Sequence, residues 1–368
     1  MTGGLIVLFG IVAMVMVHEA GHFVAAKAVG MKATEFFFGF GPKLWSTRRG
    51  ETEYGIKAIP LGGYVRIVGM NPYEEVAPED LGRTYREQPF LAKSIVVLAG
   101  VASHFIVAFL LFYTVASVIG VSVSTTTVAS VQATLEDGTP TPAVTAGLLP
   151  GDRIVSIDGN AATDWGTVVG YIADHPGDTV ELVFERGGQT MEATVTLAGI
   201  DDGEGDERGF LGVRAASVKE RSNPIAGFGD AGSAVARATS TSAVGLWRMV
   251  TGFGGLVEAV ITGDADKIDE MRPASPIGLV RIGAQTEDLG IAFTLELLAL
   301  VNVFVGLFNV VPIYPLDGGH FAVALYEKIR GRQADVRKLA PVAAVVVVFM
   351  VLLGVLAIYL DIADPFDL

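Results

Sequence analysis

Four long apolar runs divide the chain, and each is long enough to cross a membrane as a helix. They cover residues 2–26, 94–123, 289–316 and 339–360. About 20 apolar residues in helical conformation span the hydrocarbon core of a bilayer, and all four runs reach that length. The hydrophobic pattern therefore predicts a polytopic α-helical membrane protein with four transmembrane helices.

The segment after the first run has the pattern of a small β structure. Residues 36–42, 53–59 and 60–68 combine aromatic and β-branched residues with Gly and Pro, which is typical of short strands joined by tight turns. We predict a β-rich loop and connector over residues 30–93. Its apolar character fits two arrangements, a loop that re-enters the membrane beside the first helix and a small surface sheet.

The segment between the second and third runs has the pattern of a folded domain followed by a linker. Alternating stretches at 179–185 and 191–197 predict strands, and residues 163–173 predict a helix. Residues 223–262 have helical spacing but retain charged residues, so one or two amphipathic helices at the membrane surface are expected rather than a fifth span. These charged residues are Asp230, Arg237, Arg248 and Glu258.

The distribution of basic residues indicates which segments face the cytoplasm. Residues 27–93 contain 10 Lys and Arg, and residues 318–338 contain five against two acids. Residues 124–288 contain 11 basic and 24 acidic residues. Because short basic loops stay in the cytoplasm, the first two segments are expected inside and the third outside. With four spans, both termini then lie outside.

These observations divide the chain into nine segments. They are a first transmembrane helix (1–29), a cytoplasmic β loop and connector (30–93), a second span (94–123), an outer domain (124–200), an outer linker with amphipathic helices (201–288), a third span (289–317), a cytoplasmic loop (318–338), a fourth span (339–360) and an outer tail (361–368).

Composition narrows the class of function. The net charge is −14, and hydrophobic residues make up 51% of the 368 residues, with a mean hydropathy of +0.50. An acidic chain of this kind is unsuited to nucleic-acid binding, so its partners are expected in the membrane. The sequence has no cysteine, which excludes disulfides and thiol chemistry, so a bound metal must use His, Asp or Glu.

The first apolar run contains the pentapeptide HEAGH, from His18 to His22. These two histidines and Glu19 are the only ionisable residues in residues 2–26. A charged side chain at the centre of a membrane helix costs about 3 kcal/mol, so their presence calls for a function. Residues four apart share a helix face, so the histidines can bind one metal while Glu19 activates a water molecule. This arrangement is typical of zinc hydrolases.

A cleaved signal peptide is the alternative interpretation of this run. No Lys or Arg precedes the run, however, and no small-residue cleavage site follows it. A transmembrane helix with a hydrolytic motif is therefore the better prediction.

A catalytic zinc site needs a third protein ligand, and the end of the third apolar run offers one. The sequence NVVPIYPLDGGH, from Asn309 to His320, places two prolines and two glycines around an acidic residue. A helix broken there lets Asp317 turn inward. Two runs that both cross from outside to inside also place Asp317 and HEAGH at a similar depth. His320 is expected to leave the core.

These motifs resemble those of the site-2 protease family of intramembrane zinc metalloproteases, over nearly the whole chain. HEAGH matches the family's HExxH, and NVVPIYPLDGG matches its NxxP…LDG element; FGFGP and PLGGYV in the β loop match as well. Residues 125–199, with PAVTAGLLPGDRIVSIDG, resemble a single bacterial PDZ domain, as in the actinobacterial Rip-type members. The resemblance implies an α+β PDZ domain outside the cell, which either binds peptides in a groove or, as we favour, excludes bulky proteins.

The family resemblance implies a Zn²⁺ site and catalytic roles for particular residues. The implied zinc ligands are His18, His22 and Asp317, with Glu19 as general base. Asn309 is then expected to donate a hydrogen bond to the scissile carbonyl or its oxyanion. An interhelical hydrogen bond is the alternative for Asn309.

The second run departs from the family pattern. Residues 100–104 read GVASH where the family has an element of the type GPxxN, so His104 stands in the place of an asparagine. We expect His104 to make a structural or substrate contact, because a fourth metal ligand, the alternative, would close the position that catalysis needs open. Gly62 and Gly63 in the β loop are further candidate substrate contacts, where an extended segment can pair with a strand.

Residues and resemblance together predict an intramembrane zinc endopeptidase of a bacterial cell membrane. It is expected to cut transmembrane segments of single-span proteins near the cytoplasmic side. The partners that the family implies are anti-sigma factors after an upstream site-1 cleavage, or remnant signal peptides. The alternative is a non-proteolytic PDZ-bearing membrane scaffold, against which the intact HEAGH and LDG motifs argue. A metal transporter would need polar residues along most spans, and the second and fourth lack them.

Overall fold

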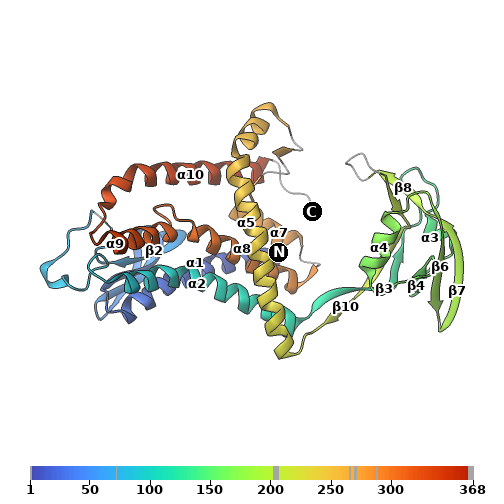
Figure 1. The fold of residues 1–368 in the computed structure, drawn as a ribbon, viewed down its shortest axis with the longest axis horizontal. Coiled ribbons are helices and arrows are strands. Elements are labelled where there is room, and N and C mark those ends of the chain that lie inside the picture. Colours follow the sequence, from blue (N-terminus) through green and yellow to red (C-terminus); the bar gives the residue numbers. More distant parts are fainter. Residues whose placement is uncertain are drawn as a thin grey trace. The chain divides into compact units, whose positions relative to one another are not determined.

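The computed structural model consists of two compact units, one formed by Met1–Ile119 with Ser222–Leu368 and the other by Gly120–Arg221. Figure 1 shows the first as helices with a small β element and the second as a sheet with short helices. A helical part with spans and an inserted α+β part is thus confirmed as the coarse fold class. The residues described are 2–71, 73–201, 207–264, 267–268, 272–286 and 289–363.

The helical unit is built on four long apolar helices, α1 (Thr2–Ala28), α2 (Phe90–Thr114), α8 (Ile291–Val310) and α10 (Ala340–Ala363). Helix α2 continues as a π-helical segment, Val115–Ile119. Helices α2 and α8 meet at the buried residues Ala108, Ala299 and Val303. Small residues at such a contact let the backbones approach closely, which is how helices pack in membranes.

A further helix, α5 (Pro224–Thr262), is also long and apolar enough to span a membrane, so the described residues contain five candidate spans. The predicted count of four is therefore not confirmed. The sequence pattern predicts one or two helices here, and the structure has a single helix of 39 residues. The Asn223 side chain caps its start, and its end is marked by Gly263 in a left-handed conformation. Figure 1 shows α5 running across the direction of α2 and α10 rather than along it.

Helix α7 (Pro276–Gln285) packs against both α1 and the end of α10. Glycines permit backbone contact between α7 and α1, because a Cβ at Gly3 would lie 2.0 Å from the Gly283 carbonyl oxygen. The buried Asp361 carboxylate accepts a hydrogen bond from the backbone N–H of Ser275 (2.8 Å) at the start of α7. Asp361 is thus held in the last turns of α10, whereas the sequence predicts an outer tail from residue 361; residues 364–368 lie outside the described residues.

Residues 318–338 differ from the predicted loop because most of them are helical. Helix α9 (Asp317–Arg330) ends at Gly331, which has a φ of 65°, and a 3-10 turn at Val336–Leu339 leads into α10. Helix α9 packs on α2 with Phe321 against Phe90 and with Glu327 paired to Lys93. The segment is short and rich in charged residues, which is why its sequence predicts a loop.

Two long strands, β1 (Ala33–Arg49) and β2 (Thr52–Ile67), form the β element of the helical unit. The sequence predicts several short strands; the structure has a hairpin whose strands bend, so that Phe37 pairs with Tyr64 on one side and with Gly55 on the other. Strand β2 packs against α1, which places the element beside the first helix. A 3-10 turn, Pro78–Asp80, lies in the connector that follows.

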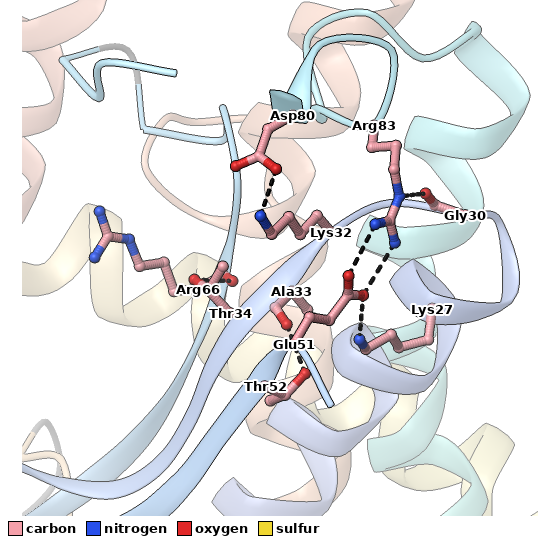
Figure 2. Close-up of polar contacts among 10 residues, drawn as sticks. All are labelled: Lys27, Gly30, Lys32, Ala33, Thr34, Glu51, Thr52, Arg66, Asp80 and Arg83. Atoms are coloured by element: carbon pink, nitrogen blue, oxygen red, sulfur yellow. Dashed lines mark hydrogen bonds and ion pairs between the residues drawn. The ribbon is translucent and has the colours of Figure 1, made fainter. Parts of the chain in front are cut away.

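Charged residues fasten the turn of this hairpin to the end of α1 and to the connector, as Figure 2 shows. The Glu51 carboxylate accepts hydrogen bonds from the Arg83 guanidinium (2.8 and 3.0 Å) and from Lys27 in the last turn of α1. Close by, Lys32 pairs with Asp80. Hydrogen bonds from Arg83 and Lys27 hold the pKa of Glu51 at about 2. The hairpin is therefore fixed to the helix that carries HEAGH.

Replacing Glu51 by Gln is expected to lower the melting temperature of the purified protein near neutral pH and to have less effect in acid. The pKa of Glu51 in the folded state is about 2, below its ordinary value of 4.5, so folding favours the charged form. This stabilisation is present above about pH 4.5 and is lost as the pH falls toward 2. The melting temperatures of the two proteins should therefore converge below pH 4.5.

The matched control for this change is Glu75→Gln, at an exposed position of the same connector. It should leave the melting temperature close to that of the unmodified protein throughout. A Glu51→Gln deficit that stays constant from pH 7 to pH 3 would contradict the role of the charge.

The second unit is a sheet folded around one apolar core. Its strand order is β10–β3–β4–β6–β7, with β5 beside β4, and β8 pairs separately with β9. Buried residues from several strands and from α4 fill the core, including Ile154, Leu182 and Phe184. The elements are β3 (Val121–Val131), α3 (Pro142–Thr145), β4 (Arg153–Ile157), β5 (Asn160–Ala161), α4 (Trp165–Ala173), β6 (Thr179–Arg186), β7 (Gln189–Thr196), β8 (Ala198–Asp201), β9 (Glu207–Phe210) and β10 (Val213–Glu220).

This unit is longer than the domain predicted at residues 124–200. The predicted strands and helix correspond to β6, β7 and α4, but β10 lies beyond residue 200 and pairs with β3 at the start of the unit. The chain therefore enters this unit through β3 and leaves it through β10, which is the neighbouring strand of the sheet. Residues 213–220 therefore belong to the sheet rather than to the predicted linker.

Candidate metal centre and active site

Three side chains from distant parts of the chain converge in the helical unit. His18 and His22 lie on α1, and Asp317 is the first residue of α9. The two histidine Nε2 atoms are 3.1 Å apart, and Asp317 Oδ2 lies 3.6 Å from His18 Nε2 and 3.2 Å from His22 Nε2. The structure therefore brings together the three residues that the sequence predicts as zinc ligands.

The spacing and chemistry of these atoms fit a tetrahedral zinc ion. Ligand atoms about 2.05 Å from such an ion lie about 3.3 Å from one another, close to the three observed separations. His22 Nδ1 lies 2.8 Å from the Val96 carbonyl oxygen and donates to it, so Nε2 of the neutral ring presents its lone pair to the other ligand atoms. Asp317 Oδ2 is buried and has no hydrogen-bond partner. Three acceptor atoms that converge in a buried site fit a cation bound between them.

Glycines let α2 approach α1 at the level of HEAGH. A Cβ at Gly100 would lie 2.2 Å from His22 Nε2, and a Cβ at Gly21 would lie 2.6 Å from the Ala99 carbonyl oxygen. The backbone of α2 thus passes beside the His22 ring while Val96 holds its other nitrogen. The sequence around Gly100 does not predict this contact with His22. A glycine inside an apolar helix indicates only that another helix can approach closely at that point.

Replacing Gly100 by Ala is expected to displace the His22 ring and to weaken zinc binding. The new methyl group would lie 2.2 Å from Nε2, and the ring cannot turn away without losing its bond to Val96. Disturbing the groups that orient a metal ligand costs about 10–100-fold in metal affinity. Competition with a zinc chelator measures this change. Gly354→Ala in α10, where a Cβ has open space, is the matched control, and equal zinc affinity in both variants would refute the close approach.

An irregular turn between α8 and α9 aims Asp317 at α1. Helix α8 ends at Val310, and residues 311–316, with their two prolines, separate it from α9. A Cβ at Gly318 would lie 2.0 Å from the Val310 carbonyl oxygen, and Gly319 is similarly close to the backbone of the turn. The predicted helix break is present, and Asp317 begins the next helix instead of ending the third span.

Glu19 lies next to the metal-binding histidines and faces β2. Its carboxylate faces the backbone of Val65, and a Cβ at Gly63 would lie 3.6 Å from Glu19 Cγ and 2.8 Å from Met16 Sδ. The adjacent Gly62 has a φ of 97°, which favours glycine. Strand β2 therefore passes over α1 at HEAGH, and Gly63 stands where a side chain would collide with Met16. This placement brings Gly63 beside Glu19, while the neighbours of Gly62 are Phe40 and Val15.

His104 lies beside His18 and is almost fully buried. The two ring centroids are 4.8 Å apart. His104 Nδ1 lies 3.3 Å from Oδ1 of Asn302 in α8, and the Asn302 amide donates to the Leu298 carbonyl (2.8 Å). Among the described residues, the converging ligand atoms do not include His104. Asn302 is not among the predicted site residues. A polar amide inside an apolar run often marks a functional site, and that pattern indicates Asn302.

The structure bears on the alternative hydrogen bond of Asn309 and on the expected position of His320. The Asn309 amide donates to the Val305 carbonyl one turn earlier in α8 (3.1 Å), so its hydrogen bond is intrahelical. The His320 ring packs against Tyr314 and Tyr85, with ring centroids 4.8 and 6.3 Å away. It stays inside the helical unit because α9 continues where the sequence predicts a loop.

Comparison with known proteins gives matches over nearly the whole chain. A family model described as Peptidase family M50 matches residues 6–353. Zinc metalloprotease Rip1 of Mycolicibacterium smegmatis is 35% identical, over 99% of this chain and 98% of that protein, and Rip1 of Mycobacterium tuberculosis has the same identity and coverage. A putative zinc metalloprotease of Nostoc is 31% identical, over 87% of this chain and 84% of that protein.

Solved structures match only part of the chain. The PDZ domain of an SdrC-like protein from Listeria monocytogenes is 30% identical, covers 26% of this chain and 92% of that chain, and has a TM-score of 0.21.

The family match confirms the resemblance predicted from the sequence, together with zinc as cofactor and a membrane location. It agrees with the geometry, since the HExxH motif lies on α1 and its two histidines lie within metal-binding distance of the Asp317 carboxylate from α9. The chain therefore belongs to peptidase family M50 and is a zinc metalloendopeptidase of the site-2 protease type.

Proposed function

We propose that the protein cuts transmembrane segments of single-span membrane proteins within or near the cytoplasmic leaflet. The observation that carries this proposal is the convergence of two histidines and an aspartate inside a bundle of apolar helices. Ionisable groups are costly at this depth, and a hydrolytic site there is accessible to segments that lie in the bilayer.

In this proposal the two histidines of HEAGH and Asp317 hold zinc. When bound, zinc polarises the peptide carbonyl and lowers the pKa of water. Glu19 takes the proton of the attacking water and delivers it to the leaving amine. Asn309 donates to the scissile carbonyl or its oxyanion, for which its amide must leave the Val305 carbonyl.

Strand β2 is the proposed platform for the substrate. A transmembrane helix has its carbonyl groups engaged in hydrogen bonds, so it must unwind locally before attack. Gly63 lies beside Glu19, and neither Gly63 nor the adjacent Gly62 carries a side chain that would stand between a substrate and the β2 backbone. An extended substrate can pair with such a strand, which stabilises the unwound form. His104, next to His18, is a further proposed contact.

We further place the active site near the cytoplasmic side of a bacterial cell membrane, with both termini outside. The basic residues at 27–93 and 318–338 support this orientation. It requires four spans, so α5 must lie along the outer membrane surface. The direction of α5 across α2 and α10, and exposed apolar residues such as Phe228 and Trp247, support that position.

The proposed substrates are single-span proteins that another protease has shortened outside, such as anti-sigma factors, or remnant signal peptides. The α+β unit, residues 120–221, is proposed to exclude proteins with bulky outer domains. The test compares the membrane proteomes of cells that carry the protein or its Glu19→Gln variant. Single-span fragments without outer domains should accumulate in the variant. If no fragments accumulate, the cleavage proposal fails; if intact proteins with large outer domains accumulate, the exclusion role fails.

A further inference from the structure

A cavity of about 320 Å³ lies where the start of α2 meets the end of α9. Phe90 and Lys93 of α2 line one side, and Ala324 and Lys328 of α9 line the other. Lys328 is about three helical turns from Asp317, so the cavity is separate from the metal centre. Nothing in the proposed proteolytic chemistry uses it.

The lining of this cavity carries an excess of positive charge. Four cations and two carboxylates give a surplus of two positive charges; they are Arg86, Lys93, Lys328, Arg332, Glu87 and Glu327. Both carboxylates are already engaged. Glu327 accepts from Lys93 (2.6 Å) and from the Ala334 N–H (2.9 Å), and Glu87 accepts from the Gly82 N–H (2.7 Å). Arg86 donates through one guanidinium nitrogen to the uncharged Asn71 carbonyl. Arg86, Lys328 and Arg332 therefore keep the positive charge that a bound anion would meet.

The position of the cavity indicates which anion is available. Helix α2 begins at Phe90 and is a candidate span, so its first turn marks the end of the hydrocarbon region. Lipid phosphates lie at that level. The Lys328 ammonium stands 4.5 Å from the centre of the Phe90 ring, which keeps this charge at the apolar boundary. Basic pockets between transmembrane helices at this level are binding sites for anionic headgroups.

We propose that this cavity binds the phosphate group of an anionic membrane lipid through Arg86, Lys328 and Arg332. A lipid bound there bridges two elements of the metal centre. Helix α2 holds His22 through the Val96 carbonyl, and α9 begins with Asp317. The proposal goes beyond the proposed function and depends on α2 crossing the membrane, not on proteolysis.

The test measures lipid binding directly on the purified full-length protein. Dioctanoyl phosphatidylglycerol is titrated in a neutral detergent, and bound lipid is counted by native mass spectrometry. The double variant Lys328→Gln and Arg332→Gln should bind it about 30-fold more weakly, because each cation near a membrane surface contributes about a factor of five. The single Arg332→Gln variant, about fivefold weaker, answers the same question if the double variant unfolds. Dioctanoyl phosphatidylcholine, which has no net charge, should bind the unmodified protein and the double variant with equal affinity.

The matched control removes two positive charges outside the cavity, in the double variant Arg330→Gln and Arg337→Gln. Its affinity for phosphatidylglycerol should stay within about twofold of the unmodified protein. Equal weakening in both double variants would overturn the pocket in favour of diffuse surface charge. Displacement of the lipid by inorganic phosphate at equal concentration would overturn the lipid assignment and identify a site for free phosphate.

Discussion

Replacing Glu19 by Gln is expected to abolish cleavage of a co-expressed transmembrane substrate while zinc stays bound. Gln has the size of Glu but cannot take a proton from water. General base catalysis contributes about 10²–10⁴-fold to a rate, so cleavage should fall by that order. The three converging ligand atoms belong to other side chains, and the metal site should therefore stay intact. An immunoblot of a tagged single-span substrate measures cleavage, and elemental analysis of the purified protein measures zinc.

The matched control is Glu296→Gln, which makes the same substitution in the apolar helix α8. It should leave cleavage close to the unmodified rate. Persistent cleavage in Glu19→Gln would refute the general base. Loss of zinc from that variant would instead assign Glu19 a structural role at the metal centre.

Hydropathy and residue spacing were sufficient to predict α1 and the three side chains that converge there. HEAGH stands out because ionisable residues are costly in an apolar run, and its four-residue spacing sets both histidines on one helix face. Asp317 stands out because prolines and glycines surround an acid at the end of another run. To predict that Asp317 lies close to HEAGH, one further assumption was needed, namely that both runs cross the membrane in the same direction.

Contacts between distant segments could not be predicted in the same way. Strand β10 pairs with β3 at the other end of its unit, and no local pattern marks that pairing. Helix α9 begins with two glycines and ends with several charged residues, so its low apolar content predicts a loop although one of its faces packs on α2. The need for glycine at position 100 depends on where the His22 ring lies. Length and hydropathy allow α5 to be either a span or a surface helix, and only its direction in the fold distinguishes the two.

Replacing Asp317 by Ala is expected to remove zinc and, with it, all cleavage. Asp317 supplies the only anionic atom of the three, 3.2 and 3.6 Å from the histidine Nε2 atoms. Without it two neutral imidazoles remain, fewer than the three protein ligands that a catalytic zinc site uses. Zinc in the purified protein should fall from about one per chain to a small fraction of that. The matched control is Asp335→Ala, at an exposed acid beyond the end of α9, which should keep its zinc.

The stability of the zinc-free proteins separates loss of a ligand from loss of the fold. Without zinc, the Asp317 carboxylate can still pair with a protonated His22, whose Nε2 atom lies 3.2 Å from Oδ2. After chelation, Asp317→Ala should therefore melt at or slightly below the temperature of the unmodified protein in one cooperative transition, whereas a misfolded variant would show no such transition. Zinc retained at the unmodified level in Asp317→Ala would refute the three-residue site. The third ligand would then have to be another side chain near HEAGH, and His104, whose ring lies 4.8 Å from that of His18, would be the first to replace.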